Sequence, residues 1–390
     1  MRDFYTMLAA ELAKLDRVQA RRACPELSGR SRVHVTVGAR PALSFASNDY
    51  LDLAGDSRVA AAAAATAERE GYGSSAARLV SGDLPAHREL EAGLAAFLHR
   101  PAALVFPSGY QANLGVVTAL AGPDDLVVSD ALNHASLIDG CRLSRARPAV
   151  YPHANVGAAA DALASAPAAR RRLLVTESLF SMDGDTAPLA DLAQVAREAD
   201  AILVVDEAHA LGVHGPAGRG LCAAAGVVPD ALIGTLGKAL GASGGFVAGS
   251  SVLRDYLVNR ARTFIFTTAL PAPVAAAAAR ALEIAAGPEG DQRRARLAAL
   301  GGLLTQRLTK LRPLPSPGRA PLGPIFPFLL GENERALSVS AELRRRSIFV
   351  PAIRPPTVPA GTARLRMTLS AAHRPEDVVR LTDILAELAP

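Results

Sequence analysis

Two short segments of the sequence carry side chains that suit imine chemistry. Residues 235–238 (TLGK) supply the amine of Lys238, and residues 204–209 (VVDEAH) supply the carboxylate of Asp206. An amine can hold an aldehyde as a Schiff base, and a fixed carboxylate can keep a pyridine nitrogen protonated so that the ring accepts electrons. Either residue alone is more often a solvated charge or a helix cap, but the pair predicts a pyridoxal phosphate site.

Strand-like apolar runs must position these groups, and they alternate with segments of helix length, which is typical of an α/β fold. The runs are residues 102–106, 126–129, 172–176, 201–205, 230–234 and 245–248. The run 201–205 is apolar throughout, as expected of a buried parallel strand, so Asp206 lies at its carboxyl end, where open α/β sheets build their sites. We therefore expect a large, mostly parallel-sheet α/β domain over residues 46–280.

The last part of the chain predicts a second, smaller unit. Strands are expected near 325–330 and 363–369, and a helix over 375–388. These elements indicate a small α+β C-terminal domain over residues 281–390. Residues 1–45 are expected to form an N-terminal segment that packs with it.

A turn and a hydroxyl are placed to meet a phosphate group. Gly109 and Tyr110 follow the strand 102–106 and open a helix, so their amides can face an anion at the positive helix end. Such a turn alone is more often only a turn. Thr235, three residues before Lys238, can reach the phosphate of a group bound to that lysine.

Histidines follow two of the expected strands. His134 comes after the strand 126–129, and its flat ring can stack on a pyridine, although a lone histidine is usually structural. His209 lies three residues after Asp206 and can donate a hydrogen bond to a ring phenolate. His87 and His153 are expected at the surface, without a catalytic role. Ser181 stands in a turn-forming segment and can face the same crevice.

Arginines gather in the proline-rich segment 353–366. A guanidinium on a rigid strand suits bidentate capture of a carboxylate, and Arg354, Arg364 and Arg366 are the possible anchors. Since side chains alternate along a strand, Arg364 and Arg366 share a face, and at least one of them is expected to point inward.

Composition bounds the class of protein. The 390 residues are half hydrophobic, and the three cysteines are far apart and match no metal-ligand spacing, which favours a reducing, cytoplasmic location and no metal. The N-terminus lacks a secretion signal, and no apolar tract is long enough to span a membrane. The net charge of +5 comes from scattered arginines without interleaved aromatics, so nucleic-acid binding is a weak alternative. A nicotinamide dehydrogenase is disfavoured because no Gly-x-Gly-x-x-Gly follows a first strand.

Taken together, the motifs resemble the α-oxoamine synthases, a family of fold-type I pyridoxal phosphate enzymes, over nearly the whole chain. The resemblance rests on residues 47–51, 78–82, 108–110, 133–136, 180–185, 205–209, 237–238 and 355–359. It departs from the family pattern at Asp52, where glycine is usual, at Ala77, where serine usually precedes Arg78, and at Gly237, where many relatives carry serine.

The resemblance implies a role for each candidate residue. Lys238 would be the Schiff-base lysine, with Asp206 at the pyridine nitrogen and His209 at the phenolic oxygen. The other implied contacts are His134 stacked on the ring, Ser181 and Thr235 near the cofactor, Gly109 and Tyr110 beside the phosphate or ring, Arg366 on the amino-acid carboxylate, and Arg22, Asn48 and Thr357 on substrate. A homodimer is also implied, with Thr267 or Thr268 reaching the neighbouring subunit's phosphate.

The implied activity is condensation of L-alanine with a pimeloyl thioester, carried by coenzyme A or acyl-carrier protein, with loss of carbon dioxide, in biotin biosynthesis. The segment 353–362 favours this branch. Sister reactions of glycine or serine with other thioesters stay open, as does a non-catalytic partner subunit of the same fold, although such a subunit has no need to keep Lys238 and Asp206.

Overall fold

The computed structural model describes residues 3–29, 31–311 and 322–388. These residues form two compact units. The first contains the described residues within 1–47, 182–184 and 299–390, and the second contains residues 48–181 and 185–298. The domain boundaries expected at 45/46 and 280/281 stay a prediction, because compactness alone does not show which segments fold independently.

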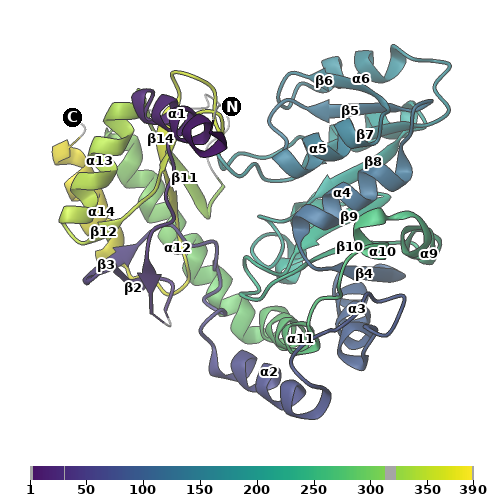
Figure 1. The fold of residues 1–390 in the computed structure, drawn as a ribbon, viewed down its shortest axis with the longest axis horizontal. Helices are drawn as coiled ribbons and strands as arrows, with labels where there is room; N and C mark the ends of the chain where they lie inside the picture. Colours follow the sequence, from purple (N-terminus) through teal and green to yellow (C-terminus); the bar gives the residue numbers. More distant parts are fainter. Residues whose placement is uncertain (1–2, 30, 312–321, 389–390) are drawn as a thin grey trace. The chain divides into compact units, whose positions relative to one another are not determined.

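A seven-stranded sheet organises the second unit, in the order β4-β10-β9-β8-β7-β5-β6. Its strands are β4 (Ala102–Phe106), β5 (Leu126–Asp130), β6 (Arg147–Tyr151), β7 (Arg172–Glu177), β8 (Ile202–Asp206), β9 (Ala231–Thr235) and β10 (Gly245–Gly249). Strands β5 to β9 run parallel, and β10 pairs antiparallel with β4 and β9. The predicted α/β fold with a mostly parallel sheet is therefore confirmed (Figure 1).

Helices of the second unit pack along this sheet. They are α2 (Ser57–Glu70), α3 (Pro85–Phe97), α4 (Gly109–Leu120), α5 (Ala135–Leu143), α6 (Val156–Ala164), α7 (Leu189–Glu198), the 3-10 turn η1 (Pro216–Gly218), α8 (Leu221–Ala224), α9 (Ser251–Arg260), α10 (Arg262–Ile265) and α11 (Ala272–Ala286). Helix α4 packs against β9 and β10 and beside α5 (Figure 1). Helices α6 and α7 pack against each other and on β5 to β8.

The apolar strands explain why the sheet edge is rigid. Leu173, Leu174 and Val175 of β7 are fully buried, as in a parallel strand covered on both faces. Val204 of β8 joins a core cluster that includes Val117 of α4. Burial of each such side chain contributes roughly 1.5–3 kcal/mol, so the strand ends are held by many contacts rather than by the loops that follow them.

The first unit contains two small sheets and three helices of its own. Its elements are α1 (Phe4–Arg17), β1 (Leu27–Ser28), β2 (His34–Val37), β3 (Arg40–Ser44), β11 (Ile325–Gly331), α13 (Asn333–Arg345), β12 (Ile348–Phe349), β13 (Ala352–Ile353), β14 (Ala363–Thr368) and α14 (Pro375–Leu388). Helix α12 (Pro288–Leu311) contributes residues to both units. Strand β12 pairs parallel with β3, so residues near the start and near the end of the chain share one sheet. The predicted C-terminal strands and helix are confirmed.

Among the described residues, no helix combines the length and apolarity needed to cross a bilayer. The same residues contain no cluster of histidine, cysteine and acidic side chains that could hold a metal ion.

Candidate active site

Three neighbouring parallel strands end in polar residues at one edge of the large sheet. Strand β7 ends at Glu177, β8 at Asp206 and β9 at Thr235. Glu177 and Asp206 are paired in register across β7 and β8. The carboxyl ends of parallel strands lie at the same edge, so these side chains meet there, as the sequence predicted for Asp206.

Lys238 lies in a hydrogen-bonded row with His209. Its Nζ is 2.8 Å from His209 Nε2, and His209 Nδ1 is 2.7 Å from the hydroxyl of Tyr50. The Tyr50 hydroxyl in turn donates to Asn48 Oδ1 at 3.1 Å. His209 therefore bridges Tyr50 and Lys238 through its two ring nitrogens.

Both carboxylate oxygens of Asp206 are engaged by N–H donors. Asn113 Nδ2 donates to Oδ2 at 2.7 Å, and the backbone N–H of Ala208 donates to Oδ1 at 2.8 Å. Asp206 is only 5% exposed. These two bonds fix the rotation of the carboxylate, as is needed for a group that must hold a proton on one particular ring atom.

Glu177 is a second buried acid beside Asp206. It is 3% exposed, and burial raises the pKa of its carboxyl well above the ordinary range, with the charge of Asp206 adding to the rise and Lys238 opposing it. The Glu177 carboxyl therefore holds its proton more readily than an exposed glutamate does.

His134 caps the N-terminus of α5. Its Nδ1 accepts the backbone N–H of Ser136 at 3.2 Å and lies 2.7 Å from the Ser136 hydroxyl. The residue keeps an exposed face, but burial of the imidazole lowers its pKa, the charge of Lys238 adds to the lowering, and Asp206 opposes it. His134 is thus a neutral, flat ring near Asp206 and Lys238.

The start of α4 forms a cradle for an anion. Ser108 is its N-cap, and a close approach places Gly245 of β10 against Gly109, because a Cβ at Gly245 would lie 2.5 Å from the Gly109 nitrogen. Thr235 also lies beside Gly109. Gln111 Nε2 donates to Thr267 Oγ1 at 3.3 Å, which brings Thr267 to this helix start. Backbone N–H groups at the start of a helix, with hydroxyl groups nearby, suit a phosphate.

Three further predicted residues have distinct settings. The hydroxyl of Tyr110 donates to Asp139 of α5, so its side chain bonds to a neighbouring helix. Ser181 is buried in the segment that follows β7, and Thr268 is exposed after α10. The cofactor contacts expected of Tyr110, Ser181 and Thr268 stay predictions.

The expectation of a surface position is wrong for His87, whereas His153 lies in a turn and is partly exposed. His87 is fully buried and donates from Nε2 to the carbonyl of Leu270 at 2.5 Å. His153 Nδ1 and Nε2 lie 3.0 and 2.9 Å from carboxylate oxygens of Asp130 and Asp185. Burial alone would lower the pKa of His153, but the hydrogen bonds and charges of both carboxylates outweigh it and raise the pKa to about 9.

The His153 bridge should make stability depend on pH. A raised folded-state pKa contributes stability that is fully present below about pH 6.5 and is lost as pH rises through about 9. His153→Gln should therefore lower the unfolding free energy by on the order of 2–3 kcal/mol at pH 6 and by much less at pH 10. Urea unfolding across this range is the measurement. The exposed His34→Gln is the control, and an equal loss at both pH values would contradict the assigned charge.

In the first unit, the expected substrate residues Arg22 and Thr357 contact each other, and the three arginines of segment 353–366 have separate settings. Arg22 donates to Thr357 Oγ1 at 3.2 Å. Arg364 pairs with Asp183 and is buried, and Arg354 donates to the backbone carbonyl of Gln19. Arg366 is also buried, at 6% exposure, so both of the arginines that share a face on β14 point inward.

One departure from the family pattern has a conformational cause. Asp52 has a φ of 56°, in the left-handed region where glycine is favoured and aspartate is among the tolerated residues. Arg293 donates to the carbonyls of Leu51 and Asp52 at 2.6 and 2.8 Å and so ties down this turn. At Gly237 an added Cβ would make only ordinary contacts, so the missing serine is not excluded by space.

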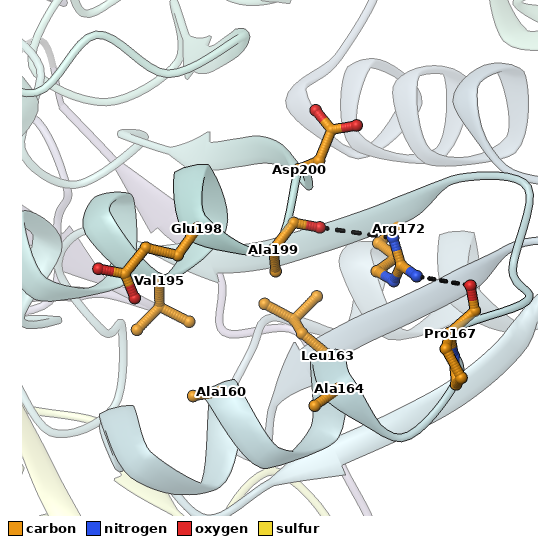
Figure 2. A pocket seen from close by; sticks show the side chains of 9 residues that line it. All are labelled: Ala160, Leu163, Ala164, Pro167, Arg172, Val195, Glu198, Ala199 and Asp200. Atoms are coloured by element: carbon orange, nitrogen blue, oxygen red, sulfur yellow. Dashed lines mark hydrogen bonds between the residues drawn. The ribbon is translucent and has the colours of Figure 1, made fainter.

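A pocket on the second unit lies away from these residues. Figure 2 shows its lining from α6, α7 and the adjoining turns, mostly alanine, leucine and valine side chains. The guanidinium of Arg172 donates to the backbone carbonyls of Pro167, which follows α6, and Ala199, which follows α7 (Figure 2). None of the strand-end residues lines it, and it offers no reactive group.

Sequence reasoning gave no role to Tyr50, Asn113, Ser136 or Glu177. A signal existed for Glu177, because it directly follows the predicted strand 172–176, as Asp206 follows 201–205. The other three act through partners from distant segments, which no local pattern reveals.

These residues fit a phosphorylated pyridine aldehyde. An amine, a fixed carboxylate, a flat neutral imidazole and a helix-start cradle beside Thr235 meet at one sheet edge, and Gly245 keeps the cradle free of a Cβ. Fold and site therefore define a pyridoxal phosphate-dependent enzyme. A family model described as aminotransferase class I and II matches residues 40–385.

Known relatives narrow this class. The chain is 52% identical over 384 residues to the 8-amino-7-oxononanoate synthase of Anaeromyxobacter dehalogenans, covering 98% of this chain and 94% of the relative. It is 50% identical over 389 residues to that of Bordetella petrii, covering 98% and 97%. The chain belongs to the family of 8-amino-7-oxononanoate synthases, within the class I and II aminotransferases.

Solved structures agree with this membership. Serine palmitoyltransferase from S. paucimobilis, solved with PLP and myriocin, superposes with a TM-score of 0.91 at 29% identity, covering 99% of this chain and 98% of that one. The 8-amino-7-oxononanoate synthase of Francisella tularensis has a TM-score of 0.76 at 28% identity, covering 89% and 97%.

Proposed function

We propose that this chain condenses L-alanine with a pimeloyl thioester, carried by coenzyme A or acyl-carrier protein. The products are 8-amino-7-oxononanoate, carbon dioxide and the free carrier thiol, in biotin biosynthesis. The observation that carries the proposal is the row of Lys238 and His209 next to Asp206, in a chain about half identical to named 8-amino-7-oxononanoate synthases over nearly its full length.

Pyridoxal phosphate, when bound, supplies an aldehyde for the amino group and a ring that accepts the electrons released at Cα. Lys238 would hold that aldehyde and, once the substrate amine has replaced it, would take the proton from Cα of alanine. Asp206 would hold the proton on the pyridine nitrogen, and His209 would bond the phenolic oxygen. His134 would cover one face of the ring.

The remaining residues would bind and orient the cofactor and the substrate. The start of α4 with Gly109 and Tyr110, together with Thr235, would hold the phosphate, and Ser181 would lie near the cofactor. The condensation joins alanine Cα to the acyl carbon, releases the carrier thiol, and then releases the alanine carboxylate as carbon dioxide. Lys238 would return a proton to Cα.

Arg366 would anchor the alanine carboxylate, with Asn48, Arg22 and Thr357 contacting substrate. The choice of Arg366 follows from the family resemblance, and the residue is buried on β14. A guanidinium can bind a carboxylate through two parallel hydrogen bonds, whereas an ammonium cannot reproduce this fork.

Arg366→Lys should therefore weaken alanine binding by about 1.5–3 kcal/mol, or roughly 10- to 150-fold, with little change in cofactor absorbance. Titration of the cofactor spectrum with alanine measures this dissociation constant. Arg364→Lys is the matched control, because its guanidinium bonds Asp183, and its cost should appear in thermal stability. An unchanged alanine constant in Arg366→Lys would move the anchor elsewhere.

A panel of thioesters tests the whole function. Purified protein is given pimeloyl, acetyl, succinyl and palmitoyl thioesters with alanine, glycine or serine, and release of carrier thiol is followed. Alanine with pimeloyl thioester should be the best pair by at least tenfold. Preference for serine with palmitoyl thioester would instead match the serine palmitoyltransferases whose fold this chain shares. No turnover with any pair would favour a non-catalytic partner subunit.

We further propose a homodimer in the cytoplasm, in which Thr267 or Thr268 reaches the neighbouring subunit's phosphate. The exposure of Thr268 supports such a reach, whereas Thr267 bonds to Gln111 at the start of α4 of its own chain. Exposed apolar residues such as Leu79 and Phe266 are consistent with a surface that a second copy covers.

A further inference from the structure

A continuous chain of hydrogen bonds joins Asp206 to His134 through two residues from other elements. Asn113 of α4 donates from Nδ2 to Asp206 Oδ2 at 2.7 Å and to Ser136 Oγ at 2.8 Å. Ser136 of α5 then lies 2.7 Å from His134 Nδ1. Asn113 is 3% exposed and Ser136 is fully buried, so these bonds are shielded from water.

The orientation of the Asn113 amide follows from its neighbours. Its oxygen cannot face the Asp206 carboxylate, which only accepts hydrogen bonds, so the NH₂ group must face it. Both N–H groups are then used, one on Asp206 and one on Ser136. Within the described residues Asn113 Oδ1 is buried without a partner, a cost that the two donated bonds must offset.

The Ser136 hydroxyl in turn donates a hydrogen bond to His134. Because its oxygen accepts from Asn113, its single proton is available for His134 Nδ1. The backbone N–H of Ser136 donates to the same nitrogen at 3.2 Å. His134 Nδ1 thus faces two donors and must accept, which leaves the ring proton on Nε2.

We propose that Asn113 and Ser136 are positioning residues that hold His134 as the neutral Nε2–H tautomer, with its ring orientation tied to the carboxylate of Asp206. The inference deepens the proposed function, since it rests on the assignment of His134 to the cofactor ring. It makes Nε2–H the hydrogen-bond donor of His134 to a ligand, and it couples His134 to Asp206, two of the residues that would contact the cofactor ring.

The experiment observes His134 directly. Full-length protein with ¹⁵N-labelled histidine is studied by long-range ¹H–¹⁵N correlation across pH, with cofactor bound and after its removal. His134→Gln assigns the signal. The titratable groups facing the ring are Asp206, Lys238, Asp139 and Glu177, so each variant is compared with wild type at the same pH. The expected wild-type signal is a neutral Nε2–H ring at pH 7.

Ser136→Ala removes the hydroxyl donor and should give a mixture of tautomers, with titration of His134 shifted upward by about half to one pH unit. Asn113→Ala should act in the same direction, and Ser136→Thr, which keeps the hydroxyl, should restore the Nε2–H form. If Asn113→Ala fails to fold, the Ser136 pair decides alone.

Two results would overturn the inference: an Nδ1–H or protonated ring in the wild type at pH 7, or a tautomer and titration unchanged in Ser136→Ala. Neither readout requires turnover. Failure of the thioester panel with the expected tautomer would therefore count against the proposed function alone.

Discussion

Replacing Lys238 with alanine should abolish proton exchange at Cα of alanine while the protein still binds the cofactor. Asp206, His134 and the start of α4 would still hold the ring and phosphate, but the amine proposed to hold the aldehyde and move the proton would be gone. Loss of a nucleophile and base at one atom should reduce exchange by at least about 10³-fold. Deuterium exchange followed by proton NMR is the measurement.

The chain contains few lysines, so the lysine that binds the cofactor covalently can be identified directly. The sequence contains only Lys14, Lys238 and Lys310. Lys14 is exposed and paired with Glu11, and Lys310 is exposed on α12. Borohydride reduction followed by peptide mapping should place the cofactor on Lys238, and Lys310→Ala should behave as wild type. Label on Lys14 or Lys310, or undiminished exchange in Lys238→Ala, would refute the assignment.

Asp206→Asn should lower turnover by at least about 100-fold, because an amide cannot hold the proton on the pyridine nitrogen through a negative charge. The penalty should be larger for exchange at Cα than for cofactor affinity. Cofactor affinity should also fall, since both Asp206 oxygens accept N–H donors, and the amide nitrogen must now face Asn113 or Ala208. Deuterium exchange and cofactor titration separate the two effects.

The exposed Asp255→Asn provides a matched control for the loss of one carboxylate. Glu177 provides a sharper one. Because burial raises the pKa of the Glu177 carboxyl, the uncharged isostere in Glu177→Gln should be tolerated, with turnover within about threefold of wild type. Near-normal exchange in Asp206→Asn would overturn the role of Asp206, and a loss in Glu177→Gln as large as that in Asp206→Asn would show that Glu177 is charged.

Local patterns in the sequence predicted most strands of the large sheet and two of the candidate site residues, Asp206 and Lys238. Apolar runs of strand length predicted six strands of the large sheet, because a strand covered on both faces must be apolar throughout. The edge strand β6 was missed because it is largely exposed and begins with arginine and proline. The position of Asp206 directly after such a run then predicted its place at the sheet edge. Lys238 followed from chemistry, because an amine near a fixed acid at that edge suits one kind of cofactor.

Which polar groups bond to one another depends on the packing of elements that are far apart in the sequence. His153 looked like a loop residue, yet Asp130 and Asp185, which are distant in sequence, surround it. Alternation places Arg364 and Arg366 on one face, but only the fold shows that Arg364 pairs with Asp183. Hydrogen bonds between side chains depend on ångström-scale placement of separate elements, which periodicity does not encode.

The link from Asp206 through Asn113 and Ser136 to His134 shows the same limit most clearly. Its members come from β8, α4 and the start of α5, and each residue type is ordinary in its local setting. The sequence determined that an acid and an imidazole stand at strand ends. The packing of α4 beside α5 and across β9 and β10 decided that one amide joins them, because only folded helices bring that amide within 3 Å of both partners.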